Sequence, residues 1–392
     1  MSAAAPAATA ATAATAAEAV VVGVTREKQP GEARVALVPE IAAKFAAAGA
    51  RIVAERGAGA AAQFPDAAYR NVEFVDDAAS VYARAGLLLK VQPLTPAEAG
   101  QLRPGTVHAG FMQAHNNLAA VRLLRERNVT SFAMELVPRI SRAQSMDALS
   151  SQAAVAGYKA VLIAANTLDR FLPMLTTAAG TIRPAQVLVI GVGVAGLQAI
   201  ATARRLGAIV EAYDVRSATR DQVKSLGAKF VETGVTAEGA GGYARELNDE
   251  EKQKQQEVLD GRIAVADAVI TTAGVPGRPA PRIVSRAAVE RMKSGAIVVD
   301  ILAENGGNCE LTRAGETVRH GGVRIVGPVN LPAQLAYHAS EMYARNLYNL
   351  LIPALKAGVL EFDWSDEVFA GTVLTHAGEV RHEPTARLLA AG

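Results

Sequence analysis

A glycine-rich turn between two apolar runs constrains the fold of this chain more than any other feature. Residues 187–190 read VLVI, and Gly191-x-Gly193-x-x-Gly196, a helix-compatible run and a second apolar run ending at Asp214 follow. In such a unit the glycines permit a tight turn, close approach of a pyrophosphate, and close packing of helix on strand. The first amides of the helix would face the pyrophosphate with the positive end of the helix dipole. The sequence therefore predicts a dinucleotide site.

The acid at the end of this unit indicates which dinucleotide to expect. Asp214 follows Gly196 by 18 residues, where a carboxylate would hydrogen-bond the adenosine ribose. A carboxylate suits the free hydroxyls of NAD(H) and repels the 2′-phosphate of NADP(H), so NAD(H) is expected. Arg216 could in principle hold a phosphate, although beside Asp214 a solvated or diphosphate-facing side chain is favoured. The expected cofactor-binding residues of this domain are Gly191, Gly193, Val194, Ala195, Gly196, Asp214, Val215, Arg216 and Ala273.

Composition narrows the classes of protein that remain. The chain has 392 residues, enough for two domains, and its formal charge of +2 implies neither nucleic acid nor a membrane surface as partner. Its one cysteine, Cys309, excludes a disulfide framework and fits a reducing compartment. We expect no metal site, and no apolar run approaches the roughly 20 residues that span a bilayer. Residues 1–19 are nearly all Ala and Thr without a basic start, which predicts a disordered tail and a cytoplasmic location.

Strand-like and helix-like segments alternate through both halves of the chain. Such alternation indicates parallel sheets covered by helices, so we predict an α/β fold with two doubly wound, Rossmann-like domains and an interdomain cleft. Long apolar helices over 147–168 and 333–357 are expected to connect the domains. The predicted boundaries are a tail over 1–19, a first domain over 20–138 plus 333–392, and an NAD(H)-binding domain over 139–332. Strands are expected at 20–24, 51–54, 73–75, 87–91, 106–111 and 130–136, then at 187–190, 209–213, 229–231, 268–272, 296–301 and 324–326.

Residues 232–261 interrupt this alternation. A glycine-rich stretch precedes Tyr243, and charged residues from Asn248 to Asp260 follow, with helical propensity but little apolar face. We expect the charged part to be solvated. A long insertion in a compact domain is either disordered or functional. Its place near the nucleotide favours a mobile loop over 232–248, tipped by Tyr243 and including Gly242 as a cofactor contact, with plain disorder as the alternative.

The opening segment and the glycine turn together resemble the alanine dehydrogenase and pyridine nucleotide transhydrogenase family. The glycine-turn segment resembles the family's second signature, with Val192 where a small residue is commoner. The resemblance covers about residues 20–375. Residues 23–40, GVTREKQPGEARVALVPE, resemble the family's opening motif. The matching positions are Arg26, Glu27, Glu32, Arg34, Val35 and Pro39.

Two features resemble the transhydrogenase branch of the family. Residues 134–161, MELVPRISRAQSMDALSSQAAVAGYKAV, resemble a loop that lies against the nicotinamide in that branch. The glycine-rich insertion resembles its mobile loop, which closes over bound NAD(H). Without the family, the polar groups of residues 139–150 could equally cap the helix beginning near Asp147. The resemblance assigns hydride-transfer roles to Arg139, Gln144, Asp147, Ser150 and Tyr243, and the first four are also expected to contact the cofactor.

A third feature separates the chain from the dehydrogenase branch, which holds and deprotonates its substrate with a lysine and a histidine. Lys90 matches the lysine, but Gln113 stands where the histidine is expected, and His115 lies two residues later. Glutamine is not a general base at neutral pH. Hydride transfer between two nicotinamides needs no acid or base from the protein, since the chemistry belongs to the cofactors. Asp300, Glu304 and Asn305 are also expected to border the cleft, with a role only in ordering their loops as the alternative.

The resemblance implies the NAD(H)-binding component of a proton-translocating transhydrogenase. The chain would position NADH for hydride transfer to NADP+ on a separate NADP(H)-binding component, coupled to proton movement by a membrane-embedded component. It would have no membrane span of its own. It would form a homodimer in the cytoplasm, peripheral on the inner membrane through its partners. The alternatives are a stand-alone NAD-dependent alanine dehydrogenase and a non-catalytic NAD(H)-binding module.

Overall fold

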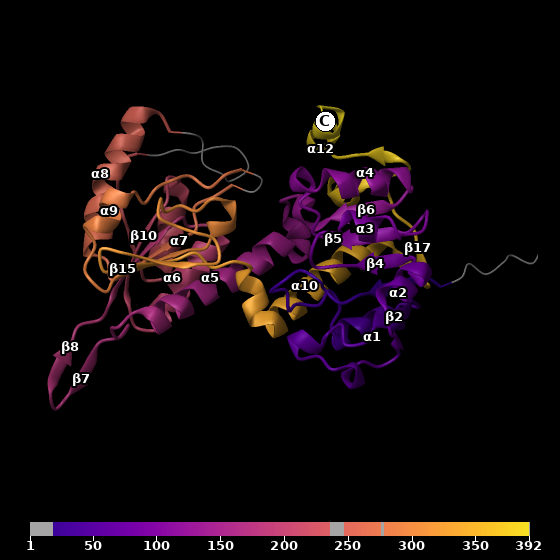
Figure 1. Ribbon diagram of the computed structural model, residues 1–392, viewed down its shortest axis with the longest axis horizontal. Coiled ribbons are helices and arrows are strands. Elements are labelled where there is room, and N and C mark those ends of the chain that lie inside the picture. The colour runs from indigo at the N-terminus through magenta and orange to yellow at the C-terminus, as the bar shows by residue number, and fades with distance from the viewer. Residues whose placement is uncertain (1–18, 236–246, 276–277, 392) are drawn as a thin grey trace, which may run out of the picture.

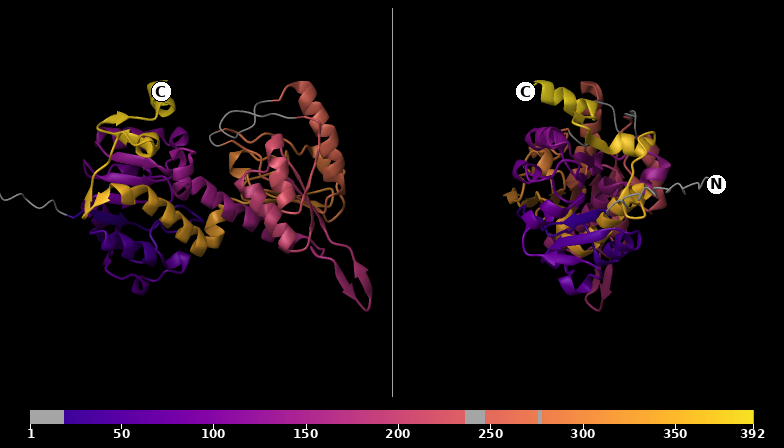
Figure 2. Two further views of the ribbon diagram at one scale, coloured as in Figure 1. Left: turned by 180° about the vertical axis from the view of Figure 1, so that it is seen from behind. Right: turned by 90° about the vertical axis from the view of Figure 1, so that its right-hand side faces the viewer.

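The computed structural model describes residues 19–235, 247–275 and 278–391. Two lobes, each built on one large sheet, lie side by side and are joined by the helix α5 (Ala148–Thr167) and by the segment that leads back into α10 (Ala336–Leu351) (Figures 1 and 2). Gly242, Tyr243 and most of the expected mobile loop lie outside the described residues.

The first lobe contains an eight-stranded sheet in the order β19-β18-β6-β5-β4-β1-β2-β3. Its parallel strands follow the order 3-2-1-4-5-6 of a dinucleotide-binding domain. Two antiparallel strands, β18 (Val373–His376) and β19 (Glu379–Val380), extend the sheet beside β6, so the chain returns to this sheet near its end. The parallel strands are β1 (Val21–Val24), β2 (Arg51–Glu55), β3 (Glu73–Val75), β4 (Leu87–Leu89), β5 (Val107–Gly110) and β6 (Thr130–Ala133).

The second lobe repeats this topology in a seven-stranded sheet of order β11-β10-β9-β12-β13-β15-β14. Among the described strands of this sheet, β14 (Thr317–His320), which was not expected, is the one that runs antiparallel to its neighbour. The prediction of an α/β fold with two doubly wound sheets is therefore confirmed. The parallel strands are β9 (Gln186–Ile190), β10 (Ile209–Tyr213), β11 (Lys229–Phe230), β12 (Ala268–Thr271), β13 (Ile297–Asp300) and β15 (Val323–Val326).

The central strand β9 is buried on both faces, which explains its unbroken apolar sequence. Val187 and Val189 pack in one core with α5, α6 (Val194–Arg205) and α7 (Arg220–Ser225). Leu188 and Ile190 pack in the core on the other face, with α8 (Asp249–Val265) and α9 (Arg286–Glu290). Each such aliphatic side chain contributes roughly 1.5–3 kcal/mol on burial.

The first sheet is covered in the same way. Leu87 and Leu89 of β4 pack in one core with α1 (Pro39–Ala47) and α10. Leu88 packs in the core on the opposite face of the sheet. The remaining helices of this lobe are α2 (Ala78–Arg84), α3 (Pro96–Ala99), α4 (Leu118–Glu126), α11 (Glu367–Thr372) and α12 (Glu383–Ala391).

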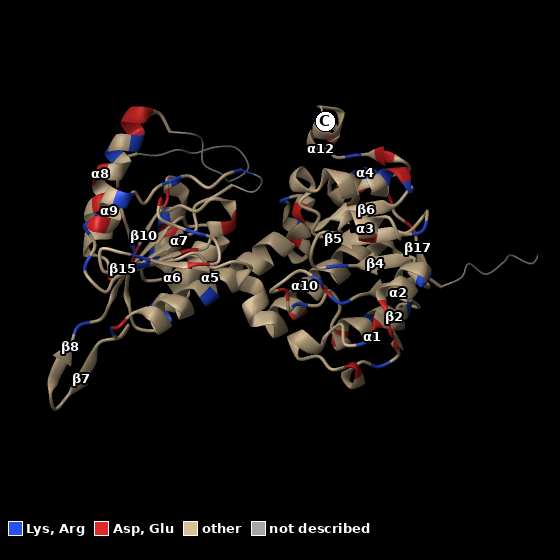
Figure 3. Ribbon diagram, in the orientation of Figure 1, with Lys and Arg blue, Asp and Glu red and all other residues tan. Residues whose placement is uncertain are grey.

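The charged helix α8 is exposed along most of its charged part, as expected, but one face of the helix is buried. Gln255, Leu259 and Ile263 recur at intervals of four and are buried. They form a narrow stripe against the second sheet, while the rest of the helix carries charges of both signs (Figure 3). A helix with few apolar residues can thus pack when those residues share one face.

The connecting helix α5 is long and apolar enough to cross a membrane by length and composition, which the sequence-based expectation of no such run did not foresee. Its composition has a packing explanation in the structure. A Cβ at Gly157 would lie 2.0 Å from Ala195 O, so α5 and α6 approach at backbone contact distance. Asp147 caps the helix at its expected start, accepting a hydrogen bond from Ser150 N at 2.9 Å.

A hairpin that the sequence analysis did not foresee projects from the second lobe. Its strands are β7 (Leu175–Thr177) and β8 (Gly180–Ile182), and neither carries a charged residue (Figures 1 and 3). Met174 and Ile182 are 64% and 48% exposed.

The second long helix is shorter than expected. Helix α10 ends at Leu351, before Pro353, and a small hairpin of β16 (Leu355–Lys356) and β17 (Val359–Leu360) follows.

Candidate functional site

The glycine turn between β9 and α6 has the geometry of a dinucleotide-binding turn. Gly191 has φ 94°, and a Cβ there would lie 2.7 Å from Ala273 N, so only glycine fits. A Cβ at Gly196 would lie 1.9 Å from Gly191 O, which shows close packing of helix on strand. A Cβ at Gly193 would meet nothing within 4 Å, so this glycine faces open space. Two glycines are therefore required by packing, and the third leaves the surface accessible.

The first turn of α6 offers backbone amides at this surface. Gly193 is the N-cap and supplies no side-chain acceptor to them. Val194 is exposed and Ala195 is half-buried. Uncapped amides at a helix N-terminus attract anions through hydrogen bonding and the helix dipole.

The carboxylate of Asp214 is joined to the glycine turn. Its Oδ2 accepts a hydrogen bond from Val192 N at 2.7 Å. Arg216 donates from its backbone N and its Nε to Oδ1, at 2.9 and 2.8 Å, and its Nη2 lies 2.7 Å from Oδ2. The guanidinium that could have held a phosphate is therefore paired with the acid, and Val215 between them is half-buried.

A cavity of about 160 Å³ lies beside Asp214, at the carboxyl ends of β10 and β11. Arg220 and Glu232 form an ion pair of 2.7 Å in its wall, and the Arg220 guanidinium lies 5.8 Å from the centre of the Phe230 ring. Sequence reasoning did not identify this cavity, although an acid and a basic residue near adjacent strand ends were visible. Its lining residues are Tyr213, Asp214, Ser217, Arg220, Phe230, Glu232, Thr233, Gly234 and Val235.

Asn308 holds the loop that supports the turn from the other side. It is fully buried, its Oδ1 accepts a hydrogen bond from Ala273 N at 3.1 Å, and its Nδ2 donates to Ala273 O at 2.7 Å. The neighbouring Asp300 accepts hydrogen bonds from Leu302 N and Cys309 N, so it orders its own loop. The sequence did not single out Asn308, because an asparagine in a loop carries no specific signal.

The candidate nicotinamide residues lie on the segment that leads into α5 and in its first turn, which pack against the first lobe. Asp147 and Ser150 contact each other, since Ser150 Oγ donates to Asp147 Oδ2 at 2.6 Å. The helix-capping interpretation is therefore realised in this structure, and both side chains remain half-buried. Arg139 and Gln144 are exposed on the segment before them.

Two asparagines of α10 hold this segment, and sequence reasoning missed both. Asn346 and Asn349 donate through their side-chain amides to Ser145 O at 2.9 and 3.1 Å. Ser151 Oγ also donates to Asn346 Oδ1 at 2.6 Å. Residues 139–150, the hinge segment, are thus attached to a helix about 200 residues later in the chain, which only the tertiary structure reveals.

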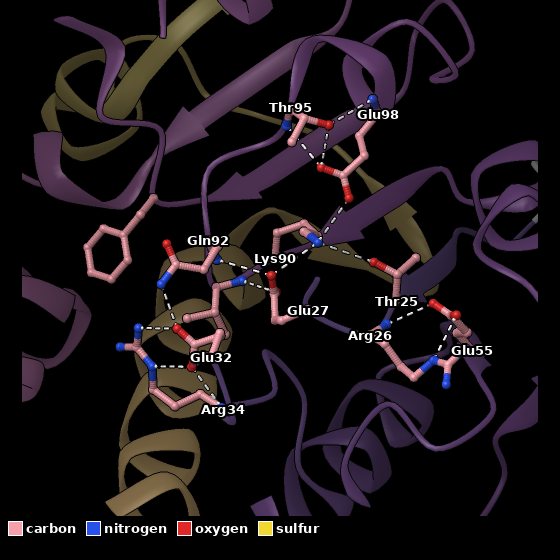
Figure 4. A network of polar contacts seen from close by, with 12 residues as sticks. Thr25, Arg26, Glu27, Glu32, Arg34, Glu55, Lys90, Gln92, Thr95 and Glu98 are labelled. Atoms are coloured by element: carbon pink, nitrogen blue, oxygen red, sulfur yellow. Dashed lines mark hydrogen bonds and ion pairs between the residues drawn. The ribbon is translucent and has the colours of Figure 1, made fainter. Parts of the chain in front are cut away.

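Lys90 lies in a buried cluster of the first lobe (Figure 4). Its Nζ is 3.1 Å from Glu27 Oε2 and 3.3 Å from Glu98 Oε1. Burial raises the pKa of Glu27, and Lys90 only partly opposes this. Burial also acts on Glu98, but Lys90 and the hydrogen bonds from Thr95 hold the pKa of Glu98 below its ordinary value. The ammonium group of Lys90 is therefore already neutralised within the protein.

At the position where the resemblance predicts a dehydrogenase histidine, the chain has Gln113, which is not a base. Gln113 is exposed with a left-handed backbone, φ 45°, and His115 is exposed on the short turn that follows. Glu135 Oε1 accepts hydrogen bonds from Met112 N and Gln113 N at 3.1 and 2.6 Å, which fixes this loop.

Comparison with known proteins identifies the family. The model of the alanine dehydrogenase/PNT N-terminal domain matches residues 23–156, and that of the C-terminal domain matches residues 160–383. The chain belongs to the alanine dehydrogenase/PNT family. This confirms the resemblance to alanine dehydrogenases and pyridine nucleotide transhydrogenases that the sequence motifs indicated.

Within the alanine dehydrogenase/PNT family, the chain is more similar to transhydrogenases. It is 44% identical over 374 residues to the first portion of the NAD(P) transhydrogenase alpha subunit of Rhodospirillum rubrum, covering 92% of this chain and 97% of the relative. A crystal structure of transhydrogenase from Sinorhizobium meliloti has 44% identity and a TM-score of 0.83, covering 92% of this chain and 99% of that one. Alanine dehydrogenase of Mycobacterium tuberculosis is 32% identical over 297 residues, covering 74% of this chain and 75% of the relative.

Proposed function

We propose that this chain is the NAD(H)-binding component of a proton-translocating NAD(P) transhydrogenase. It binds NADH at the glycine turn and presents it for direct hydride transfer to NADP+ held by a partner component. A membrane-embedded component couples this transfer to proton movement. The observation that carries the proposal is the burial of Lys90 in contact with Glu27 and Glu98, together with Gln113 in place of a histidine base.

The residues of the second lobe fit a dinucleotide. Gly193 leaves open space at the turn, and the uncapped amides of α6 suit a pyrophosphate. Asp214 suits the adenosine ribose, and its pairing with Arg216 disfavours a 2′-phosphate. The cavity beside Asp214 is placed to take the adenine base, with the Arg220 guanidinium as a stacking surface.

The nicotinamide end is assigned to the hinge segment. Arg139, Gln144, Asp147 and Ser150 provide a guanidinium, an amide, a carboxylate and a hydroxyl, groups that can hydrogen-bond a carboxamide and a ribose. Bound dihydronicotinamide supplies the hydride, so these residues have only to orient the ring and exclude water. Gly242 and Tyr243 keep their assigned cofactor roles as predictions, since they lie outside the described residues.

We also propose a homodimer formed around the projecting hairpin and α5. A two-stranded hairpin without a packed face is marginally stable in water, and this one carries exposed Met174 and Ile182. Half-exposed apolar residues also run along α5, whose one charged residue is Lys159. A second copy would cover both surfaces.

The complex would be peripheral at the cytoplasmic face of the inner membrane. The Rhodospirillum rubrum relative is named as one portion of a subunit, which supports a chain that works within a larger assembly. NADP(H) would be bound by a partner component rather than by this chain.

The test of this function compares two acceptors for bound NADH. The purified chain, at concentrations where fluorescence shows NADH bound, should not oxidise it with pyruvate plus ammonia. It should do so with NADP+ once an NADP(H)-binding transhydrogenase component is added. Rapid ammonia-dependent turnover would instead make the chain an amino-acid dehydrogenase. Tight binding without transfer to any acceptor would indicate a non-catalytic NAD(H)-binding module.

A further inference from the structure

The opening segment of the chain contacts both connections between the lobes. The chain leaves the first lobe along α5 and returns through the segment between β15 and α10 (Figure 1). Arg34, which is 5% exposed, lies between these two connections. Its Nη1 donates to Gln152 Oε1 of α5 at 2.8 Å, and its Nη2 donates to Asn330 Oδ1 of the return segment at 3.2 Å. One guanidinium therefore bridges both crossings of the chain.

Glu32 fixes the orientation of this guanidinium (Figure 4). Arg34 Nε donates to Glu32 Oε1 at 2.9 Å and Nη2 donates to Oε2 at 2.6 Å, a bidentate pair. The amides of Gln92 and Asn330 donate to the same Oε2 at 2.5 and 3.1 Å. Because the guanidinium is planar and Glu32 holds its Nε–Nη2 edge, its remaining donors point in defined directions.

Each far partner of Arg34 makes a further contact, one with α10 and one with the second lobe. Gln152 Nε2 donates to Ala339 O of α10 at 3.1 Å, and Gln152 lies two residues after Ser150. Asn330 has a left-handed backbone, φ 44°, and its N donates to Glu304 Oε2 of the second lobe at 3.1 Å. A non-glycine residue keeps this conformation where its surroundings hold it.

We propose that Arg34 is a positioning residue for hydride transfer, because it sets the geometry between the two lobes. Its side chain ties α5 to the return segment, and these are the two connections about which the lobes could rotate. The hinge segment and the glycine turn lie on either side of that junction, so their relative placement depends on it. A misplacement of about 1 Å at a reacting centre can slow a reaction about a hundredfold. The catalytic part of this inference rests on the proposed function, whereas the geometric part does not.

The experiment compares three changes made in the full chain. Arg34→Gln removes the bridge. The double change Gln152→Met with Asn330→Gly removes both far contacts but keeps the buried Arg34–Glu32 pair, and glycine accepts the left-handed backbone. Arg26→Gln is the matched control, since Arg26 lies on the same segment and its ion pair with Glu55, 2.9 Å, stays within the first lobe (Figure 4).

Three quantities are measured for each variant: NADH affinity by fluorescence, kcat and KM for transfer to NADP+ with the partner component, and small-angle X-ray scattering of the chain alone. We expect the Arg34 variant and the double variant to lose about tenfold to a hundredfold in kcat. Their KM for NADH should change less than about threefold, because the adenosine contacts remain. Their scattering should show an altered or broadened distance between lobes, and the Arg26 control should match the wild type.

Wild-type kcat and scattering in the double variant would overturn the proposal. Equal effects of Arg34→Gln and Arg26→Gln would also overturn it, because they would reduce Arg34 to an ordinary stabilising residue. Absence of transfer by the wild-type chain with its partner would refute the proposed function, while the scattering comparison would still decide the geometric role of Arg34.

Discussion

Asp214 Oδ2 accepts a hydrogen bond from Val192 N at 2.7 Å, so the acid that follows β10 is joined directly to the glycine turn that follows β9. The two residues come just after neighbouring parallel strands whose carboxyl ends meet at one edge of the sheet. This edge is where ligands bind in open α/β sheets. The contact therefore places Asp214, the candidate for binding the ribose, and the glycine turn, the candidate for binding the pyrophosphate, in one surface.

Asp214→Ala should weaken NADH binding. A hydrogen bond to a charged group contributes about 1.5–3 kcal/mol, which corresponds to about tenfold to a hundredfold in Kd. Fluorescence titration with NADH and NADPH measures both the loss and the expected fall in discrimination. Asp221→Ala, an exposed acid in α7, is the control. Unchanged NADH affinity would remove Asp214 from the ribose role.

Gly193→Ala should weaken NADH binding without affecting stability, whereas Gly196→Ala should lower stability. The first adds a methyl group in open space, so thermal stability should stay unchanged while NADH affinity falls about tenfold, or about 1.4 kcal/mol. The second places a Cβ against Gly191 O and should lower the free energy of unfolding by about 1–3 kcal/mol. Thermal denaturation and NADH titration of both variants give the comparison. Loss of stability in the Gly193 variant would contradict the conclusion that this glycine faces open space.

The contributions of Glu27 and Glu98, the two acids beside Lys90, to the free energy of unfolding should change with pH in opposite directions. Burial raises the folded-state pKa of Glu27, so its contribution to stability is present at low pH and is lost as pH rises from about 4.5 through the folded pKa. The folded pKa of Glu98 is lowered, so its contribution is present above about 4.5 and is lost as pH falls through the folded value. Denaturant unfolding of wild type, Glu27→Gln and Glu98→Gln at several pH values measures this. Parallel pH profiles for the two variants would refute the assignment.

Gln144→Ala should slow hydride transfer more than it weakens NADH binding. Gln144 is exposed on the hinge segment and is assigned to the nicotinamide end, away from the adenosine contacts. Arg142→Ala is the matched control, because Arg142 on the same segment is paired with Asp366 at 2.5 Å. Steady-state transfer with the partner component should show kcat reduced about tenfold for Gln144→Ala and near wild type for the control. Equal rates would make the segment structural.

Met174→Ser with Ile182→Ser should shift the chain from dimer to monomer. The two changes remove exposed apolar side chains beside and on the hairpin, which is proposed to pack on a second copy. Sedimentation equilibrium measures the association state. Leu388→Ser, on α12 of the first lobe and 45% exposed, controls for loss of surface apolar area. A wild-type chain that sediments as a monomer would contradict the proposed dimer.

Local sequence determined the elements whose signal lies within a few residues. The unit from β9 through α6 to β10 could be predicted because its signals follow one another in one stretch of the chain. These signals are the apolar runs of strands buried on both faces, the glycines of the turn and the acid after the second strand. The start of α5 at Asp147 could be predicted for the same reason, since a helix cap depends on residues three positions apart. The family resemblance extended these predictions to residue roles, but the roles stay predictions.

Tertiary structure alone decided which side chains meet across the sheets. Lys90 could be seen in the sequence, but its 3.1 Å contact with Glu27 depends on β1 lying beside β4. Arg34 meets Gln152 and Asn330 across separations of 118 and 296 residues, and no local pattern records such a pairing. The physical reason is that periodicity and turn chemistry act along the chain, whereas the environment of a buried charge is set by the order in which the strands and helices pack.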